Sequence, residues 1–371
     1  MTRPLHVHLG CSKTGTSSLQ AGMWRSVEAM RAAGVGLPFQ DREAHLTHLL
    51  RPLGWRPVDA FSRPANEARL ARVPEILAST PGDRLLVSNE DLAELTHVQA
   101  ERIAGFADQA DLDLHLVLTV RGWADQVPSE YQQFLKHRMT LTYPEFVDAI
   151  RTRTGEWAER FWRRQDPVRV LDQWAGLVPA EKVHVIAVPS YSKDPDGVFR
   201  MMGEAVGFDA SVIQRPTGAL NSSFGVVEAE LWRRVNVALG DRLPEFTRGY
   251  GTALRFPFER GVIPKLASPR VGLPDDVVPW LQEHGHATVA TLQERGYVLA
   301  GDFERLIPAD DAGRPVVVPA EKEIADAAVQ AIANLAVRHD ERVKGIRAVK
   351  TPAPAPRTES SARPRWLRWG R

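Results

Sequence analysis

The stretch Leu5-His6-Val7-His8-Leu9-Gly10-Cys11-Ser12-Lys13-Thr14-Gly15-Thr16-Ser17-Ser18-Leu19-Gln20 decides the fold of this chain. Apolar residues at alternate positions from Leu5 to Leu9 predict a short strand, and hydroxyl residues from Thr16 onward predict the start of a helix. The loop between them is rich in glycine, serine and threonine. Such a loop turns its amides inward, and the helix adds unpaired N–H groups and the positive end of its dipole. The stretch therefore predicts a binding site for an anion.

The position of the lysine separates this loop from the usual nucleotide-triphosphate loop. There a lysine directly follows the second glycine, and a serine or threonine after it holds magnesium. Here Thr16 follows Gly15, and Lys13 stands two residues before that glycine. We expect its ammonium to reach an oxygen that bridges two transferable groups, without a metal. Taken alone, the segment could also be a glycine-rich turn between strand and helix that binds nothing.

The core Lys13-Thr14-Gly15-Thr16-Ser17 resembles the 5′-phosphosulfate loop of the sulfotransferases that use 3′-phosphoadenylyl sulfate (PAPS). The resemblance makes Lys13 the residue that neutralises charge on the bridging oxygen. It also assigns the 5′-phosphate to the residues of the loop and the helix start, namely Ser12, Lys13, Thr14, Gly15, Thr16 and Ser17.

A second segment delivers a carboxylate. Leu85 to Val87 predict a buried strand that ends at Ser88-Asn89-Glu90, so Glu90 is expected at the carboxyl end of a parallel strand, where open α/β sheets bind ligands. In the resemblance, Glu90 matches the glutamate that many sulfotransferases use as general base toward the acceptor hydroxyl. The alternative is that Glu90 or Asp91 caps the following helix. Both roles are compatible.

A third segment delivers an arginine and a serine. Leu112 to Val120 predict a strand that places Arg121 at the same edge, and Ser129 follows eight residues later on a predicted helix. A guanidinium and a hydroxyl suit a dianionic phosphate on a ribose. Alone, Arg121 would be read as a surface ion-pair partner. Sulfotransferases hold the 3′-phosphate with an arginine and a serine at this spacing. Arg215 is a further candidate for that phosphate, although the family's usual Arg-Lys-Gly triplet is absent here.

These strands, with a fourth over Lys182 to Val188, predict an α/β fold with a parallel sheet. The resemblance implies that this fold is the three-layer α/β/α arrangement of the P-loop sulfotransferase type. We expect one sulfotransferase domain over 1–349. Its core covers about 5–239, and a helical, lid-like region covers about 240–349. Residues 350–371, rich in proline, alanine and arginine, are predicted to be a disordered basic tail.

Composition narrows the classes of partner. The 47 Lys and Arg residues against 46 Asp and Glu give a net charge of +1, which does not indicate a nucleic-acid-binding protein. Cys11 is the single cysteine, and no leader or membrane span is recognisable, so a cytoplasmic location is expected. No metal is expected, since His45 and His48 lack a third ligand nearby. The basic tail could make a weak contact with a membrane or a protein.

The resemblance implies transfer of a sulfuryl group from PAPS to an acceptor hydroxyl or amine on a carbohydrate, lipid or small molecule. Two alternatives stay open: a nucleotide-dependent kinase, against which the position of Lys13 argues, and a catalytically silent nucleotide-binding protein. The acceptor pocket is expected to come from 37–81 and 240–270, where the sequence patterns are least regular.

Overall fold

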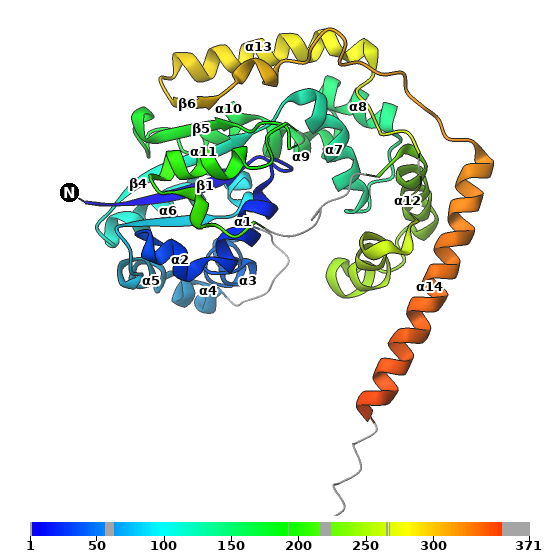
Figure 1. Cartoon of the computed structure of the whole chain (residues 1–371), viewed down its shortest axis with the longest axis horizontal. Coiled ribbons are helices and arrows are strands. Elements are labelled where there is room, and N and C mark those ends of the chain that lie inside the picture. The colour runs from blue at the N-terminus through cyan, green and yellow to red at the C-terminus, as the bar shows by residue number, and fades with distance from the viewer. Residues whose placement is uncertain are drawn as a thin grey trace, which may run out of the picture. The chain divides into compact units, whose positions relative to one another are not determined.

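The structure is a computed structural model that describes residues 2–55, 63–191, 193–215, 224–264, 266 and 268–350 (Figure 1). The chain divides into two compact units. The first, which we call the sheet unit, comprises Met1–Arg242 and Leu266–Ile324. The second contains the segment that begins at Leu243 and the chain from Ala325 onward. The candidate site residues all belong to the sheet unit, so its elements decide how they are placed.

The sheet has six parallel strands in the order β2-β3-β1-β4-β5-β6. Their bounds are β1 Arg3–Gly10, β2 Val35–Gly36, β3 Arg84–Ser88, β4 Leu112–Val120, β5 Val183–Ala187 and β6 Val298–Gly301. The predicted α/β class is confirmed, as are the four strands expected from the sequence. The short strands β2 and β6, which the sequence analysis did not predict, extend the sheet at its two edges.

Helices cover both faces of this sheet, as expected for a parallel sheet with strands buried on two sides. On one face Leu5, Val7 and Leu9 of β1 pack in a cluster with residues of α5, α6, α10 and α13. On the other, Leu86 and Val117 pack with residues of α1, α2 and α11. The bounds of the helices are α1 Thr16–Arg25, α2 Val27–Ala32, α3 Arg42–His45, α4 Arg63–Leu70, α5 Val73–Ser79, α6 His97–Gln109, α7 Trp123–Leu135, α8 Tyr143–Thr152, α9 Gly155–Gln165, α10 Pro167–Asp172, α11 Gly197–Val206, α12 Val226–Leu239, α13 Val278–Glu294 and α14 Glu321–Lys350.

The helical pattern after the loop is split in two. The apolar spacing from Ser18 to Arg31 predicts one helix, but α1 ends at Arg25 and α2 begins at Val27. Ser26 between them is non-helical, and its hydroxyl oxygen accepts a hydrogen bond from the backbone N–H of Gln214 at 2.7 Å. A tertiary contact with a distant segment therefore interrupts a helix that the local pattern alone would continue.

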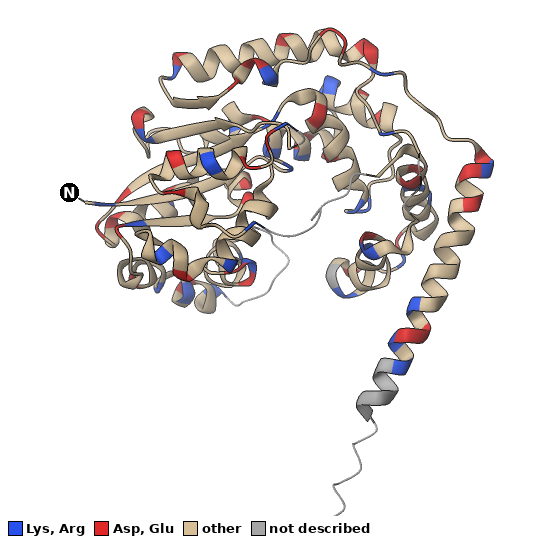
Figure 2. Ribbon diagram, viewed as in Figure 1, with Lys and Arg blue, Asp and Glu red and all other residues tan. Residues whose placement is uncertain are grey.

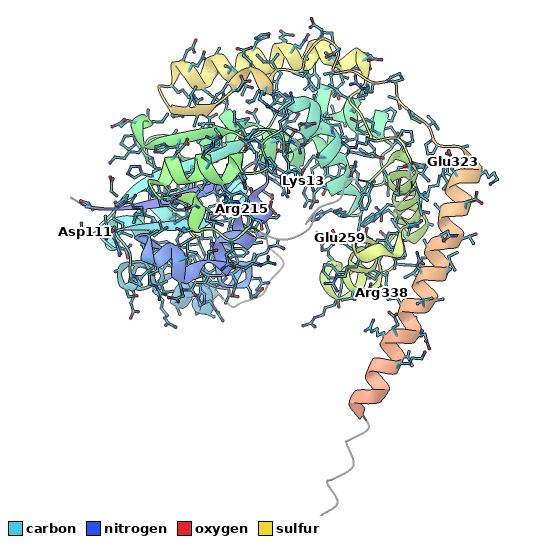
Figure 3. All side chains as sticks on the ribbon, in the orientation of Figure 1. Lys13, Asp111, Arg215, Glu259, Glu323 and Arg338 are labelled. Carbon is cyan, nitrogen blue, oxygen red and sulfur yellow. The ribbon has the colours of Figure 1, made fainter. Side chains whose placement is uncertain are left out.

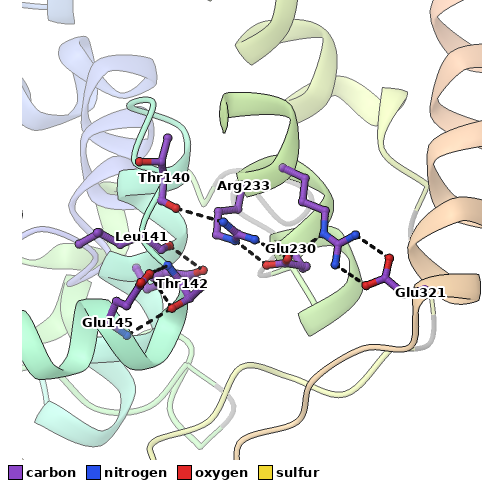
Figure 4. Close-up of polar contacts among 9 residues, drawn as sticks. Thr140, Leu141, Thr142, Glu145, Glu230, Arg233 and Glu321 are labelled. Atoms are coloured by element: carbon purple, nitrogen blue, oxygen red, sulfur yellow. Dashed lines mark hydrogen bonds and ion pairs between the residues drawn. The ribbon is translucent and has the colours of Figure 1, made fainter. Parts of the chain in front are cut away.

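Helix α12, predicted over Val226 to Leu239, is confirmed and is joined to its neighbours by an ion-pair network (Figure 4). Arg233 pairs with Glu230 at 2.6 Å and donates to the Thr140 carbonyl at 3.2 Å, next to the start of α8. Arg234 pairs with both Glu230 and Glu321. These contacts fix α12 between the connection before α8 and the first residue of α14.

Most described residues of the second unit are helical. A π-helix runs over Phe246–Arg255, and the side chain of Asn334 on α14 donates to the Val262 carbonyl at 3.0 Å. A lid role for 240–349 stays a prediction. Of the predicted tail 350–371, Lys350 is the last residue of α14, and 351–371 lie outside the described residues. Figure 2 shows acidic and basic residues interspersed along the elements, in keeping with the balanced charge.

Candidate active site

The loop after β1 has two features that ordinary turns lack. The end of β1 approaches the start of α1 so closely that a Cβ atom on Gly10 would collide with the Thr16 hydroxyl. Lys13 and Gly15 both adopt left-handed backbone conformations, with φ values of 69° and 86°. A lysine rarely adopts this conformation, which costs about 1–2 kcal/mol for a residue with a Cβ. The surrounding structure therefore enforces an alternating backbone of the kind that gathers amides around an anion.

Helix α1 begins without help from side chains. Its N-cap residue is Gly15, and within the described part of the chain the first turn has neither a side-chain cap bond nor an acidic residue. The Gly15 carbonyl accepts from the N–H groups of Ser18 and Leu19 at 3.0 and 3.1 Å. The N–H groups before them, of Thr16 and Ser17, have no partner inside a helix by geometry. This end of α1 is suited to bind a phosphate or sulfate group.

A chain of buried side chains supports the loop from below. The Thr14 hydroxyl donates to the Cys11 carbonyl at 2.7 Å and lies 2.8 Å from the Thr119 hydroxyl. Thr119 in turn lies 3.1 Å from Nε2 of His8, whose Nδ1 lies 2.8 Å from the Ser88 hydroxyl. Burial lowers the pKa of His8 to about 3, so this imidazole is neutral at ordinary pH. The Thr14 hydroxyl thus stabilises the conformation of the loop. The group of Thr14 that could bind an anion is its backbone N–H.

Two glutamines hold the other side of the loop. Nε2 of Gln126 on α7 donates to the Ser12 carbonyl and, at 2.5 Å, to Oε1 of Gln165 on α9. Gln165 itself donates to the Ser12 carbonyl at 3.5 Å. Both glutamines are buried. The sequence analysis missed this pair, because amides inside helices of mixed character read as surface residues until the tertiary contacts are known.

The structure brings Arg121 and Ser129 together with the lysine loop. Arg121 follows β4 directly, and its Nη1 lies 3.3 Å from the Lys13 carbonyl and 3.5 Å from the Ser129 hydroxyl. Its Nη2 pairs with Asp125 at 3.3 Å. Lys13, labelled in Figure 3, therefore lies in the same part of the fold as a half-buried guanidinium and a half-buried hydroxyl.

Glu90 lies where the sequence predicts, at the carboxyl end of β3. It opens a short 3-10 helix, Glu90–Glu94, which we call the Glu90 turn. Asn89 caps this turn by accepting from the Asp91 N–H at 2.9 Å. The cap that was the alternative role for Glu90 is thus provided by Asn89, and the half-buried Glu90 carboxylate is not needed for it. Its neighbour Asp91 is buried, and burial together with the field of Glu90 raises the pKa of Asp91 to about 6.

A buried ion cluster lies beside these elements. Arg164 at the end of α9 pairs with Glu94 through Nη1 at 2.9 Å and approaches Glu130 with Nε at 3.6 Å. Glu130 follows Ser129 on α7 and is fully buried. Burial raises the pKa of Glu130, against the opposing effects of Arg164, Lys13 and the Ser12 hydroxyl. This cluster, which the sequence analysis did not identify, links the loop, α7 and the Glu90 turn.

Among solved structures, the chain is similar to a crystal structure of a sulfotransferase from Alicyclobacillus acidocaldarius. The match covers 66% of this chain and 96% of that chain, with 16% sequence identity and a TM-score of 0.37. No protein-family model and no curated protein matches the sequence. The function proposed below rests on the side chains of the site and not on this likeness.

Arg215 lies on a segment that contacts α11, and α11 lies near the loop with Lys13. Its Nε pairs with Asp196 at 2.6 Å, and its guanidinium stacks 3.9 Å from the ring centre of Phe199 on α11. Val198 on the same helix lies 3.9 Å from the position of a Cβ on Gly15. Arg215, labelled in Figure 3, thus belongs to a segment that packs near the loop, and its contact with a 3′-phosphate stays a prediction.

Of the two histidines His45 and His48, His45 lies in a buried environment. His45 is buried, its Nδ1 lies 2.7 Å from the Asp41 carbonyl, and burial lowers its pKa to about 4. No group of three His, Cys, Asp or Glu side chains suited to a metal ion occurs among the residues that the structure describes. None of the described helices has the length and apolar character needed to cross a membrane.

Proposed function

We propose that this protein is a sulfotransferase that moves a sulfuryl group from PAPS to an acceptor hydroxyl or amine. One observation supports this most: the Arg121 guanidinium lies within 3.5 Å of both the Lys13 carbonyl and the Ser129 hydroxyl. A loop suited to one anion therefore adjoins a cation and a hydroxyl suited to a second. PAPS carries two such groups, a 5′-phosphosulfate and a 3′-phosphate on the same nucleotide.

The residues divide the chemistry among them. The acceptor oxygen attacks sulfur while the bond between sulfur and the 5′-phosphate oxygen breaks, which yields the sulfated acceptor and adenosine 3′,5′-bisphosphate. The acceptor proton passes to the Glu90 carboxylate. The Lys13 ammonium neutralises the charge that develops on the departing phosphate oxygen, and the amides from Thr14 to Ser17 hold that phosphate in place.

The 3′-phosphate is what separates this donor from ATP. Arg121 offers a planar fork and Ser129 a hydroxyl, which together suit a dianion on the ribose. A kinase would need a lysine after the second glycine of the loop, whereas here Lys13 precedes Gly15. The donor preference of the site is therefore a direct test of the proposal.

Two measurements test it. Isothermal calorimetry compares adenosine 3′,5′-bisphosphate with ATP and magnesium, and we expect tighter binding of the bisphosphate. Transfer of ³⁵S from labelled PAPS is then measured on a panel of glycans, lipids and phenols, and we expect at least one labelled product. Preference for ATP with magnesium would indicate the kinase alternative. Binding without transfer to any acceptor would indicate a silent nucleotide-binding protein.

A further inference from the structure

We infer that Arg164 is a positioning residue that sets the distance between the proton acceptor Glu90 and the donor cradle. The inference rests on the proposed function. Arg164 lies at the end of α9, where three parts of the site meet: the Glu90 turn, helix α7 with Ser129, and the loop with Lys13. It acts on the reaction through these neighbours.

The contacts of Arg164 reach two of these parts directly. Nη1 pairs with Glu94, the last residue of the Glu90 turn, at 2.9 Å. Nε lies 3.6 Å from Glu130, the residue after Ser129 on α7. The third part is reached through the next residue, because Gln165 contacts the Ser12 carbonyl at 3.5 Å and accepts from Gln126 at 2.5 Å. One turn of helix thus touches the Glu90 turn, α7 and the loop with Lys13.

The electrostatics favour a fixed cation at this point. Burial disfavours the charge of Arg164, but the fields of Glu94, Glu130, Asp91 and Glu90 outweigh burial and raise the pKa of its guanidinium. Both carboxylate oxygens of Glu130 are buried, and among the groups that favour its charged form Arg164 has the largest effect, ahead of Lys13 and the Ser12 hydroxyl. Since a buried carboxylate needs a compensating charge, Arg164 is the main residue that holds Glu130 at this position.

The residue type matters because of its shape. The guanidinium presents several N–H donors in one plane, so a single side chain can face Glu94 on one side and Glu130 on the other. A lysine would keep the charge at this place but concentrate it on one atom, which cannot span both carboxylates. Arg164→Lys is therefore expected to preserve charge compensation while loosening the Glu90 turn relative to α7.

The experiment compares Arg164→Lys with wild type and with Arg169→Lys, the same change in an exposed ion pair with Glu159 on a neighbouring helix. Turnover is measured with ³⁵S-PAPS and the panel acceptor that wild type sulfates fastest. For Arg164→Lys we expect kcat to fall about 10- to 100-fold, because small misplacements of reacting groups have effects of this size. The Kd for adenosine 3′,5′-bisphosphate and the KM for PAPS stay within about twofold of wild type. Arg169→Lys behaves as wild type.

A double-mutant cycle separates positioning from a general loss of structure. If Arg164 acts through Glu90, adding Arg164→Lys to Glu90→Gln lowers kcat by less than about twofold further, because the group to be positioned is already absent. Independent multiplication of the two effects overturns the inference. So does parallel loss of bisphosphate affinity and kcat in Arg164→Lys, which indicates a structural role only.

A further variant covers the case in which Arg164→Lys does not fold. Glu94→Gln removes the charge on the Glu90 side while Arg164 and Glu130 remain, and we expect the same fall in kcat with bisphosphate binding retained. Wild-type turnover in Glu94→Gln would overturn the positioning role while the proposed function stands. If wild type neither binds the bisphosphate nor transfers sulfate, the proposed function fails and the positioning role with it.

Discussion

The Arg121 side chain gives the most discriminating test of the donor site. Arg121→Lys keeps a positive charge but loses the planar fork that now lies 3.3 Å from the Lys13 carbonyl and 3.5 Å from the Ser129 hydroxyl. Hydrogen bonds to charged groups contribute about 1.5–3 kcal/mol. Because the Arg121 side chain is 31% exposed, solvent screens it, and we take the lower part of this range, about 1.5–2 kcal/mol. The affinity for adenosine 3′,5′-bisphosphate should therefore fall about 10- to 30-fold.

The comparison ligand makes this prediction specific. Adenosine 5′-phosphate lacks the 3′-phosphate, so its affinity for Arg121→Lys should stay within about twofold of wild type. Both nucleotides are titrated by calorimetry at one salt concentration, with Arg151→Lys as the control, since Arg151 forms an exposed pair with Asp148 at 2.9 Å. Equal losses for the two nucleotides would refute the assignment of Arg121 to the 3′-phosphate.

Three further predictions concern the remaining groups. Lys13→Met should lower kcat about 100-fold or more at an unchanged unfolding midpoint, because it removes charge stabilisation in the transition state; retained kcat would contradict this role. Glu90→Gln should lower turnover while the affinity for adenosine 3′,5′-bisphosphate, measured by calorimetry, stays near that of wild type; full activity would exclude Glu90 as the base. The third concerns His8, whose pKa is lowered from 6.5 to about 3 in the folded protein. As the pH falls from 6.5 to 3, His8 is protonated in the unfolded state and neutral in the folded state, so the fall in pH favours unfolding. In urea titrations, the free energy of unfolding of wild type should fall about 1.4 kcal/mol per pH unit more steeply than that of His8→Asn below pH 6.5, and parallel curves would contradict this.

The long strands and the class of fold were predictable because their physical signals are local. Leu85 to Val87 and Leu112 to Val120 are apolar runs typical of buried parallel strands, and both form strands of the sheet. Strand β2 has only two residues, too few for a period to be recognised. The break at Ser26 depends on Gln214, which no window around the helix contains.

The same distinction between local signals and tertiary contacts decides which residues of the candidate site could be predicted. The ends of neighbouring parallel strands share an edge, so the sequence could place Glu90 and Arg121 near the lysine loop. The left-handed backbone of Lys13 could not be predicted, because local preference disfavours it and the tertiary structure imposes it. The role of Arg164 could not be predicted from the sequence either, since a charged residue on an amphipathic helix ordinarily faces solvent.

The sheet order has a consequence for synthesis on the ribosome. Strand β1 lies between β3 and β4, pairing Leu5 with both Leu85 and Leu114. The lysine loop is translated before β3 and β4, and it cannot take its final form until the chain as far as β4 has emerged. Gln165 must follow before Ser12 gains its second amide partner. Until then the apolar strand Leu5–Leu9 has no neighbouring strand to pair with, and its apolar side chains remain exposed to solvent.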